Sequence, residues 1–193
     1  MEIKLKPTLS NTKVILRPLE LDDEAELWPI AKESDLWTYG LKDLSKPGEL
    51  RKYISNAIQD RGMGICAVWI IVDANSGKVA GCTRLAEISW KDERGQIGWT
   101  WIGKEFQGTG LNKAMKLEIL KYGFEVLNLN RIELKADERN GQSRKAILGI
   151  GATQEGILRQ HIKMHDGFLR NTVFYSILKS EWDAVRIKYF NQF

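Results

Sequence analysis

The sequence has little of what marks membrane-spanning, disulfide-stabilised or metal-binding proteins. Its longest apolar stretch, residues 65–72, is far too short to cross a bilayer. Its two cysteines, Cys66 and Cys82, lie in separate strand-like segments without CxxC spacing or a nearby histidine pair. We therefore expect neither a disulfide framework nor a metal site. Residues 1–7 lack an apolar stretch followed by a small-residue cleavage site, so we expect no secretory signal and a cytoplasmic location.

Charges of one sign do not gather along the chain either. Lys and Arg number 29 against 25 Asp and Glu, which gives a net charge of +4, and no run of five or more like charges appears. Direct nucleic-acid binding is therefore not expected, although an isoelectric point of about 9.0 keeps a nucleic-acid-associated module as an alternative. A mild positive excess also suits a polyanionic small ligand, such as a cofactor that carries phosphates.

The chain of 193 residues shows no internal repeat, low-complexity tract or flexible linker, and suits a single domain, residues 1–193. Apolar patterns predict strands at 14–18, 65–72, 79–90, 96–102, 131–136, 153–162 and 171–178. Helical spacing predicts helices at 21–33, 47–62, 111–127 and 140–149. Because hairpin turns occur together with at least one helical crossover, we expect an α/β fold built on a mixed, α+β type of sheet.

The most informative segment, residues 100–113, combines a strand end, a glycine-containing turn and the start of an amphipathic helix. Gly108 and Gly110 allow positive φ, so that successive backbone N–H groups can point into one concavity. The free N–H groups of the helix's first turn add partial positive charge, which suits a pyrophosphate. Gln107 and Lys113 can add a donor and a charge. An ordinary strand-to-helix connection is the alternative, because neither a Walker A loop nor a Rossmann turn is matched.

Residues 107–112 resemble the Q/R-x-x-G-x-G/A acetyl-CoA signature of the GNAT superfamily of acetyltransferases, with Asn112 in place of the last Gly or Ala. Residues 140–156 resemble the N-x-x-S…G-A/F…E-G pattern of its RimJ/RimL-like branch, the ribosomal-protein N-terminal acetyltransferases. Residues 16–23 and 166–182 are similar to the beginning and the end of that branch. The resemblance therefore covers nearly the whole chain in the expected order.

The resemblance implies a central, mostly antiparallel sheet with two splayed parallel strands and flanking helices, and acetyl-CoA held in the gap. Residues 100–102, with Trp101 and Ile102, would then pair their backbone with the pantetheine arm. Asn140 and Ser143 would approach the thioester end. The pyrophosphate would be bound by the turn and the first helical residues, namely Gln107, Gly108, Thr109, Gly110, Leu111, Asn112 and Lys113.

The catalytic residues are less clearly indicated. Many GNAT enzymes carry a tyrosine at the position of Ile147, so the proton donor to the CoA thiolate must differ here. Ser143 matches a serine to which the RimJ/RimL-like branch assigns that role, and a purely structural role in the first turn of the helix is the alternative. Glu87 and His161 are the two candidates for the base that takes the amine proton, and each could equally be a solvated or packing residue.

The expected activity is acetyl transfer to a primary amine, either a protein N-terminus or a small molecule, by direct attack in a ternary complex. Trp37 and Tyr39 lie in a loop-like stretch of the first helical region, which forms a wall of the acceptor site in this superfamily, and are candidate acceptor contacts. A non-catalytic CoA-binding sensor on the same fold is the alternative. The sequence leaves the acceptor open, as it does the choice between monomer and homodimer.

Overall fold

The computed structural model describes residues 5–191 and 193, so the prediction for the N-terminus falls partly outside the described residues. The sheet has eight strands in the order β1-β2-β3-β4-β5-β6-β8-β7. These are β1 (Leu9–Ser10), β2 (Val14–Pro18), β3 (Ala67–Asp73), β4 (Val79–Ser89), β5 (Arg94–Ile102), β6 (Arg131–Asp137), β7 (Thr153–Lys163) and β8 (Leu169–Leu178). The helices are α1 (Glu24–Ala31), α2 (Glu49–Gly62), α3 (Leu111–Lys121), α4 (Gly141–Leu148) and α5 (Trp182–Tyr189). The pairing of β5 with β6 is parallel and the other described pairings are antiparallel, which confirms the mixed sheet.

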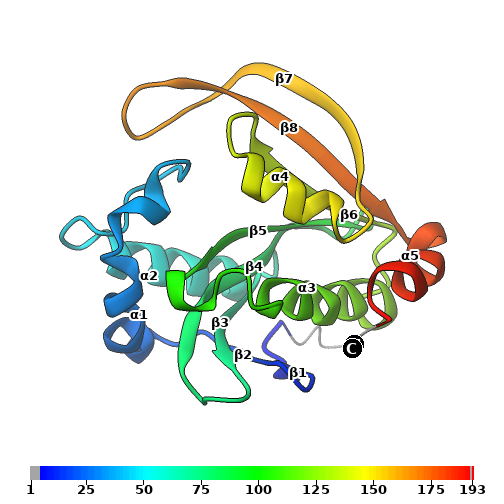
Figure 1. The fold of residues 1–193 in the computed structure, drawn as a ribbon, viewed down its shortest axis with the longest axis horizontal. Coiled ribbons are helices and arrows are strands. Elements are labelled where there is room, and N and C mark those ends of the chain that lie inside the picture. The colour runs from blue at the N-terminus through cyan, green and yellow to red at the C-terminus, as the bar shows by residue number, and fades with distance from the viewer. Residues whose placement is uncertain (1–4, 192) are drawn as a thin grey trace.

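Side chains of β3 divide alternately between two hydrophobic cores, one on each face of the sheet. Trp69 and Ile71 pack with residues of α3, α4 and α5, whereas Val68 and Ile70 pack with residues of α1 and α2. Successive side chains of a strand point to opposite faces, so a strand covered on both sides reads as a continuous apolar run. Figure 1 shows α1 in blue, α2 in cyan and α3 in green around the central strands.

The parallel strands β5 and β6 separate part of the way along their length. Their pairing runs from Arg94 opposite Arg131 to Ile97 opposite Leu134 and goes no further. A bulge at Trp99, whose φ is +50°, bends β5 just beyond this point. The edge of β5 that faces β6 therefore has no strand partner over residues 98–102, and a seam opens in the middle of the sheet.

Two helices begin beside this seam at positions that the sequence predicts. α3 starts directly after Gly110, whose φ of +90° ends the preceding turn, and a π-helical segment, Tyr122–Val126, extends it to the predicted end. The N-terminus of α4 is capped by Asn140, whose side-chain oxygen accepts a hydrogen bond of 2.9 Å from the backbone N–H of Ser143. Both helix starts thus direct unpaired N–H groups toward the same end of the sheet.

For the C-terminal residues 189–193 the sequence left open an exposed partner contact or a frayed tail, and the burial of Phe190 contradicts an exposed end. The chain forms α5, and Phe190 is only 2% exposed in the core that also contains Trp182 and Val185. The spacing of these three residues places them on one side of the helix. α5 also packs against Gly151, where a Cβ atom would lie 2.6 Å from the ring of Tyr189.

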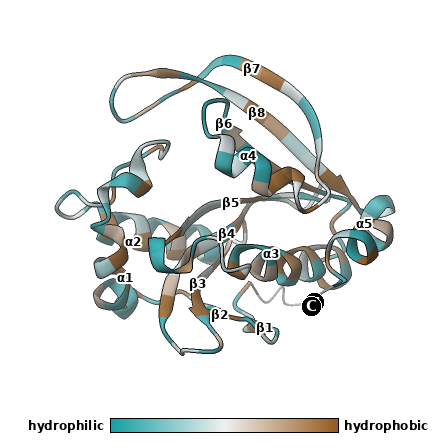
Figure 2. Ribbon diagram, viewed as in Figure 1, coloured by the Kyte–Doolittle hydropathy of each residue, from teal (hydrophilic) through white to brown (hydrophobic). Residues whose placement is uncertain are grey.

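The long hairpin of β7 and β8 extends past α4 toward the segment between α1 and α2 (Figure 1). At its tip, the His165 ring nitrogen Nε2 lies 3.2 Å from the backbone oxygen of Trp37. β7 is almost entirely exposed and carries both hydrophilic and hydrophobic segments (Figure 2). In residues 5–191 and 193, no helix has the length and apolar character needed to span a bilayer.

Candidate active site

A cavity of about 640 Å³ passes along the seam between β5 and β6 and receives side chains from both faces of the sheet. From the face of α3 and α4 it is lined by Ile97, Leu134 and Ile147, which belong to one core. From the face of α1 and α2 it is lined by Trp37 and Trp101, which belong to the other. The two cores meet only where the strands separate, so a ligand here can reach both faces.

The turn before α3 has the form that the sequence predicts for an anion site. Gly108 and Gly110 have φ values of +76° and +90°. Within the described chain, no acceptor contacts the backbone N–H of Gly108, Thr109, Gly110 or Asn112. These N–H groups lie at a helix N-terminus, where they carry partial positive charge. A Cβ atom on Gly110 would lie 3.4 Å from the Nζ atom of Lys13, a cation that the sequence did not single out.

The polar side chains of the turn are arranged to close one end of the seam. The Gln107 amide nitrogen donates to the backbone oxygen of Ile102 over 2.9 Å, and its oxygen accepts from Gln142 of α4 over 3.3 Å. Gln107 thus connects β5 to α4. Thr109 donates from its hydroxyl to the backbone oxygen of Phe106 over 2.8 Å. The Asn112 side-chain oxygen is buried without a hydrogen-bond partner among the described residues.

The remaining predicted cofactor contacts gather along the seam itself. Trp101 and Ile102 are buried on the unpaired part of β5, and the indole N–H of Trp101 has no acceptor within the described residues. Asn140 and Ser143 both line the cavity at the start of α4. No described residue hydrogen-bonds to the Ser143 hydroxyl, whereas its backbone N–H forms the helix cap with Asn140. The hydroxyl is therefore available to a ligand.

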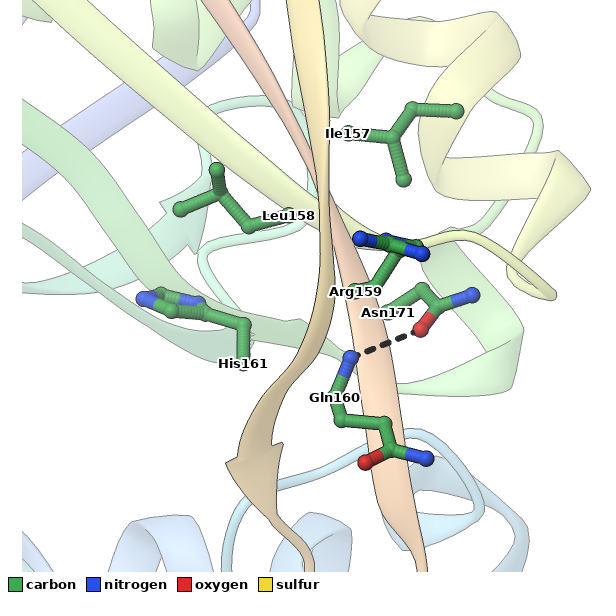
Figure 3. A pocket seen from close by; sticks show the side chains of 6 residues that line it. All are labelled: Ile157, Leu158, Arg159, Gln160, His161 and Asn171. Carbon is green, nitrogen blue, oxygen red and sulfur yellow. Dashed lines mark hydrogen bonds between the residues drawn. The ribbon is translucent and has the colours of Figure 1, made fainter.

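Both candidate bases line the same cavity. Glu87 lies at a bulge in β4, where its φ is +51°, and its carboxylate is 3.2 Å from the Nζ atom of Lys135. The ring of His161 packs edge-on against Phe174, with a centroid distance of 5.4 Å. A second hollow of about 930 Å³ lies along β7, and Figure 3 shows His161 leaving that strand on the side opposite to Arg159.

Trp37 and Tyr39 also line the cavity, in different ways. Trp37 is 6% exposed, donates its indole N–H to the Ala31 backbone oxygen over 2.8 Å, and packs edge-on against Trp101. It therefore shapes the wall from within the core. Tyr39 is 38% exposed, and the Arg139 guanidinium lies 5.6 Å from its ring centre. Of the two, Tyr39 presents more of its surface to a ligand.

Sequence reasoning missed three buried cations that line the cavity: Arg84, Lys116 and Arg170, which are 5%, 6% and 7% exposed. For Arg84 and Lys116 a signal existed, because each interrupts a strongly apolar strand or helix face. Arg84 stacks on Tyr53, at 4.0 Å from the ring centre, and lies 3.8 Å from Asp60. No local pattern distinguishes Arg170 from the other basic residues of its hairpin.

The electrostatic setting of these groups limits their chemistry. Burial lowers the pKa of Lys116 to about 8, since no described residue pairs with its ammonium group. Burial raises the pKa of Tyr53, whose hydroxyl donates to the Trp99 backbone oxygen over 3.2 Å, so this phenol stays neutral and is no base. Within residues 5–191 and 193, no group of three or more His, Cys, Asp or Glu side chains is arranged to hold a metal ion.

The chain was compared with known proteins. Residues 13–153 match the family model described as the acetyltransferase (GNAT) domain. A Bacillus subtilis protein named "Putative ribosomal N-acetyltransferase YdaF" is 35% identical over 108 residues, which is 56% of this chain and 58% of that relative. The Escherichia coli spermidine N(1)-acetyltransferase is 28% identical over 176 residues, or 91% of each chain.

A solved acetyltransferase structure shares this fold over nearly the whole chain. The crystal structure of a GCN5-related N-acetyltransferase from Brucella melitensis superposes with a TM-score of 0.87 at 26% identity. The superposition covers 96% of this chain and 85% of that one. Its extent means that the seam, the turn before α3 and the β7–β8 hairpin all belong to the shared fold.

Proposed function

We propose that this chain, which belongs to the GNAT family of acetyltransferases, is a member of the RimJ/RimL-like branch and transfers an acetyl group from acetyl-CoA to a primary amine. The observation that carries this proposal is the seam between β5 and β6, which opens beside two helix N-termini and joins the two faces of the sheet. A donor bound on the face of α3 and α4 could there meet an amine that enters from the face of α1 and α2.

The described residues fit acetyl-CoA. The free N–H groups around Gly110, with Lys13 and Lys113, suit a pyrophosphate, and the predicted contact set from Gln107 to Lys113 surrounds them. The unpaired edge of β5 offers backbone groups to the amides of the pantetheine arm. The unpartnered indole N–H of Trp101 supplies a donor in the seam. Each of these unsatisfied N–H groups thus has an acceptor in the ligand.

Acetyl transfer forms a bond between the amine nitrogen and the acetyl carbon, and breaks the bond between that carbon and the CoA sulfur. The amine gives up one proton and the departing sulfur takes one, so protons balance. Bound acetyl-CoA supplies the activated acetyl thioester. An α-amino group, with a pKa of about 8, needs little help from a base at neutral pH, whereas a lysine side chain needs more. Alignment of the two reactants supplies several kcal/mol by itself.

Within this proposal, different side chains at the seam carry out the two proton transfers. Ser143 gives a proton to the sulfur, because its hydroxyl is free and lies at the helix start where the thioester end is expected. Either Glu87 or His161 takes the amine proton, since both line the acceptor part of the cavity. Tyr39 contacts the acceptor, and Trp37, which packs against Trp101, forms part of the cavity wall.

The direct test combines calorimetry with acetyl-CoA and a CoA-release assay with a panel of primary amines. Micromolar binding together with amine-dependent CoA release is the expected result. Binding without release for any amine would favour the CoA-binding sensor instead. No association with CoA or acetyl-CoA at millimolar ligand would contradict the proposal as a whole.

A further inference from the structure

Among the ionisable side chains that line the cavity, not every cation is paired with a carboxylate. Three carboxylates line the cavity, Asp60, Glu87 and Asp137, and each already lies within 4 Å of a cation. Asp137 is held by Arg139, with a nitrogen–oxygen distance of 2.7 Å. No lining carboxylate in the described part of the chain is therefore free to receive a cationic acceptor.

Arg170 is the buried cation in the acceptor part of the cavity that no described carboxylate contacts within 4 Å, whereas Lys42, which also lines the cavity, is exposed. Arg170 lies on the same face of β8 as Phe174 and Thr172, because Val173 and Tyr175 point into the core of α3 and α4. Arg170 is 7% exposed and lines the cavity, and its side chain makes one hydrogen bond, from Nε to the Thr172 hydroxyl over 3.1 Å. Among residues 5–191 and 193, no carboxylate pairs with its guanidinium.

A buried guanidinium without a counter-ion is costly, and its two terminal nitrogens form a fork that matches a carboxylate. Burial outweighs the attraction of Asp137 and lowers the pKa of Arg170, which shows how incomplete the compensation is. The lining thus offers a cation for an acid at the end of the cavity where Arg170 lies.

We propose that the acceptor is a primary amine that also carries a carboxylate, which Arg170 binds, and that polycations are poor acceptors; this inference rests on the proposed function. Val173 of β8 pairs with Ala136 at the seam. Arg170 lies three residues from Val173 along the same strand, so its backbone is about 10 Å from the seam. A side-chain carboxylate on the second or third residue of an extended peptide matches that distance from the N-terminal amine. An acidic peptide N-terminus is the acceptor that best fits.

The test compares acceptors that differ only in the charge at that distance. The tetrapeptide amides Ala-Glu-Ala-Ala, Ala-Gln-Ala-Ala and Ala-Lys-Ala-Ala, with 6-aminohexanoate and spermidine, are assayed for CoA release. The wild type is expected to prefer the Glu peptide over the Gln peptide by at least 10-fold in kcat/KM, with the Lys peptide and spermidine lower still. The 6-aminohexanoate arm decides whether a carboxylate suffices without a peptide backbone.

The variant Arg170→Gln should reduce the preference for Glu over Gln to about 1, mainly through KM. Arg159→Gln, on the exposed side of the neighbouring strand, should keep the preference. Peptide binding in the absence of acetyl-CoA can be measured by the quenching of tryptophan fluorescence in the cavity. It should likewise show the preference for the Glu peptide lost in Arg170→Gln and kept in Arg159→Gln. Because Arg170→Gln removes an unpaired buried charge, we expect its melting temperature to be no lower than that of the wild type.

Equal or better acetylation of spermidine or the Lys peptide would overturn the inference and leave the acetyltransferase proposal in place. An equal loss on all acceptors in Arg170→Gln would also overturn it. Failure of every amine to release CoA would instead contradict the proposed function itself.

Discussion

The two halves of the seam cavity are built in different ways. Next to the half near α3 and α4, the proposed cofactor site consists largely of backbone, namely two helix starts, the free edge of β5 and the turn with positive φ at Gly108 and Gly110, which lies outside the cavity lining. The half near α1 and α2 consists of side chains such as Tyr39, Glu87 and Arg170, which come from elements far apart in the sequence. A backbone site suits one constant ligand, whereas a side-chain site can be changed for each acceptor.

The largest effect is expected on the acceptor half, from the residue that takes the amine proton. Of the variants Glu87→Gln and His161→Gln, the one that removes the base should lower kcat about 100- to 10,000-fold and remove the low-pH limb of the pH–rate profile. The other should keep that limb and serves as the control. Unchanged pH–rate profiles in both variants would exclude both residues.

On the cofactor half, Gly110→Asp should weaken CoA binding about 100-fold or more. The variant places a negative charge beside the expected pyrophosphate and strains a residue whose φ is +90°. Calorimetry measures the loss. Gly77→Asp is the matched control, because its φ of +70° brings a similar backbone cost, whereas its backbone N–H already donates to the Asp73 backbone oxygen over 2.8 Å. Equal CoA affinity in both variants would contradict the assignment of the turn.

The buried charge of Lys116, which lines the cavity, is expected to lower the stability of the folded protein. Its pKa is lowered to about 8 in the folded protein, so the unfolded chain binds more protons between pH 8 and about 10.5. Stability should therefore rise with pH across this window. Lys116→Met should be more stable than the wild type by about 3 kcal/mol below pH 8, and the difference should narrow toward pH 10.5.

Denaturant unfolding at pH 7 and pH 10 measures this difference. Lys113→Met, on the same helix but partly exposed, should show little pH-dependent gain. A Lys116→Met variant that is less stable than the wild type at pH 7 would mean that the ammonium group has a stabilising partner in solution.

The smallest effects distinguish the two roles considered for Ser143. The helix cap is formed by the Asn140 side chain and the Ser143 backbone, so Asn140→Ala should cost about 1 kcal/mol of unfolding free energy. Ser143→Ala should change stability by less than about 0.5 kcal/mol but lower kcat about 10-fold, an effect that a donor with a more acidic leaving thiol should reduce. If kcat stays at the wild-type value, Ser143 is not the proton donor.

The difference between the backbone-built cofactor site and the side-chain-built half also separates what the sequence could predict from what it could not. The turn at Gly108 and Gly110 and the cap at Asn140 rest on local signals, since glycines and caps act within a few residues, whereas the splayed parallel pair is implied by the family resemblance. The pairing of Glu87 with Lys135, and the missing partner of Arg170, depend on strands that meet only in the folded sheet. α5 was not predicted, and only its last residue lies within the segment 189–193 that the sequence left open as a partner contact or a frayed tail.

The central claim is that an acyl thioester occupies the seam between β5 and β6, and hydrogen exchange tests it most directly. Saturating acetyl-CoA should slow exchange of the backbone amides of residues 98–102 and 108–112, while the amides of β3, already paired on both sides, should exchange as before. Unchanged exchange in both segments at saturation, or protection confined to other elements, would contradict the account.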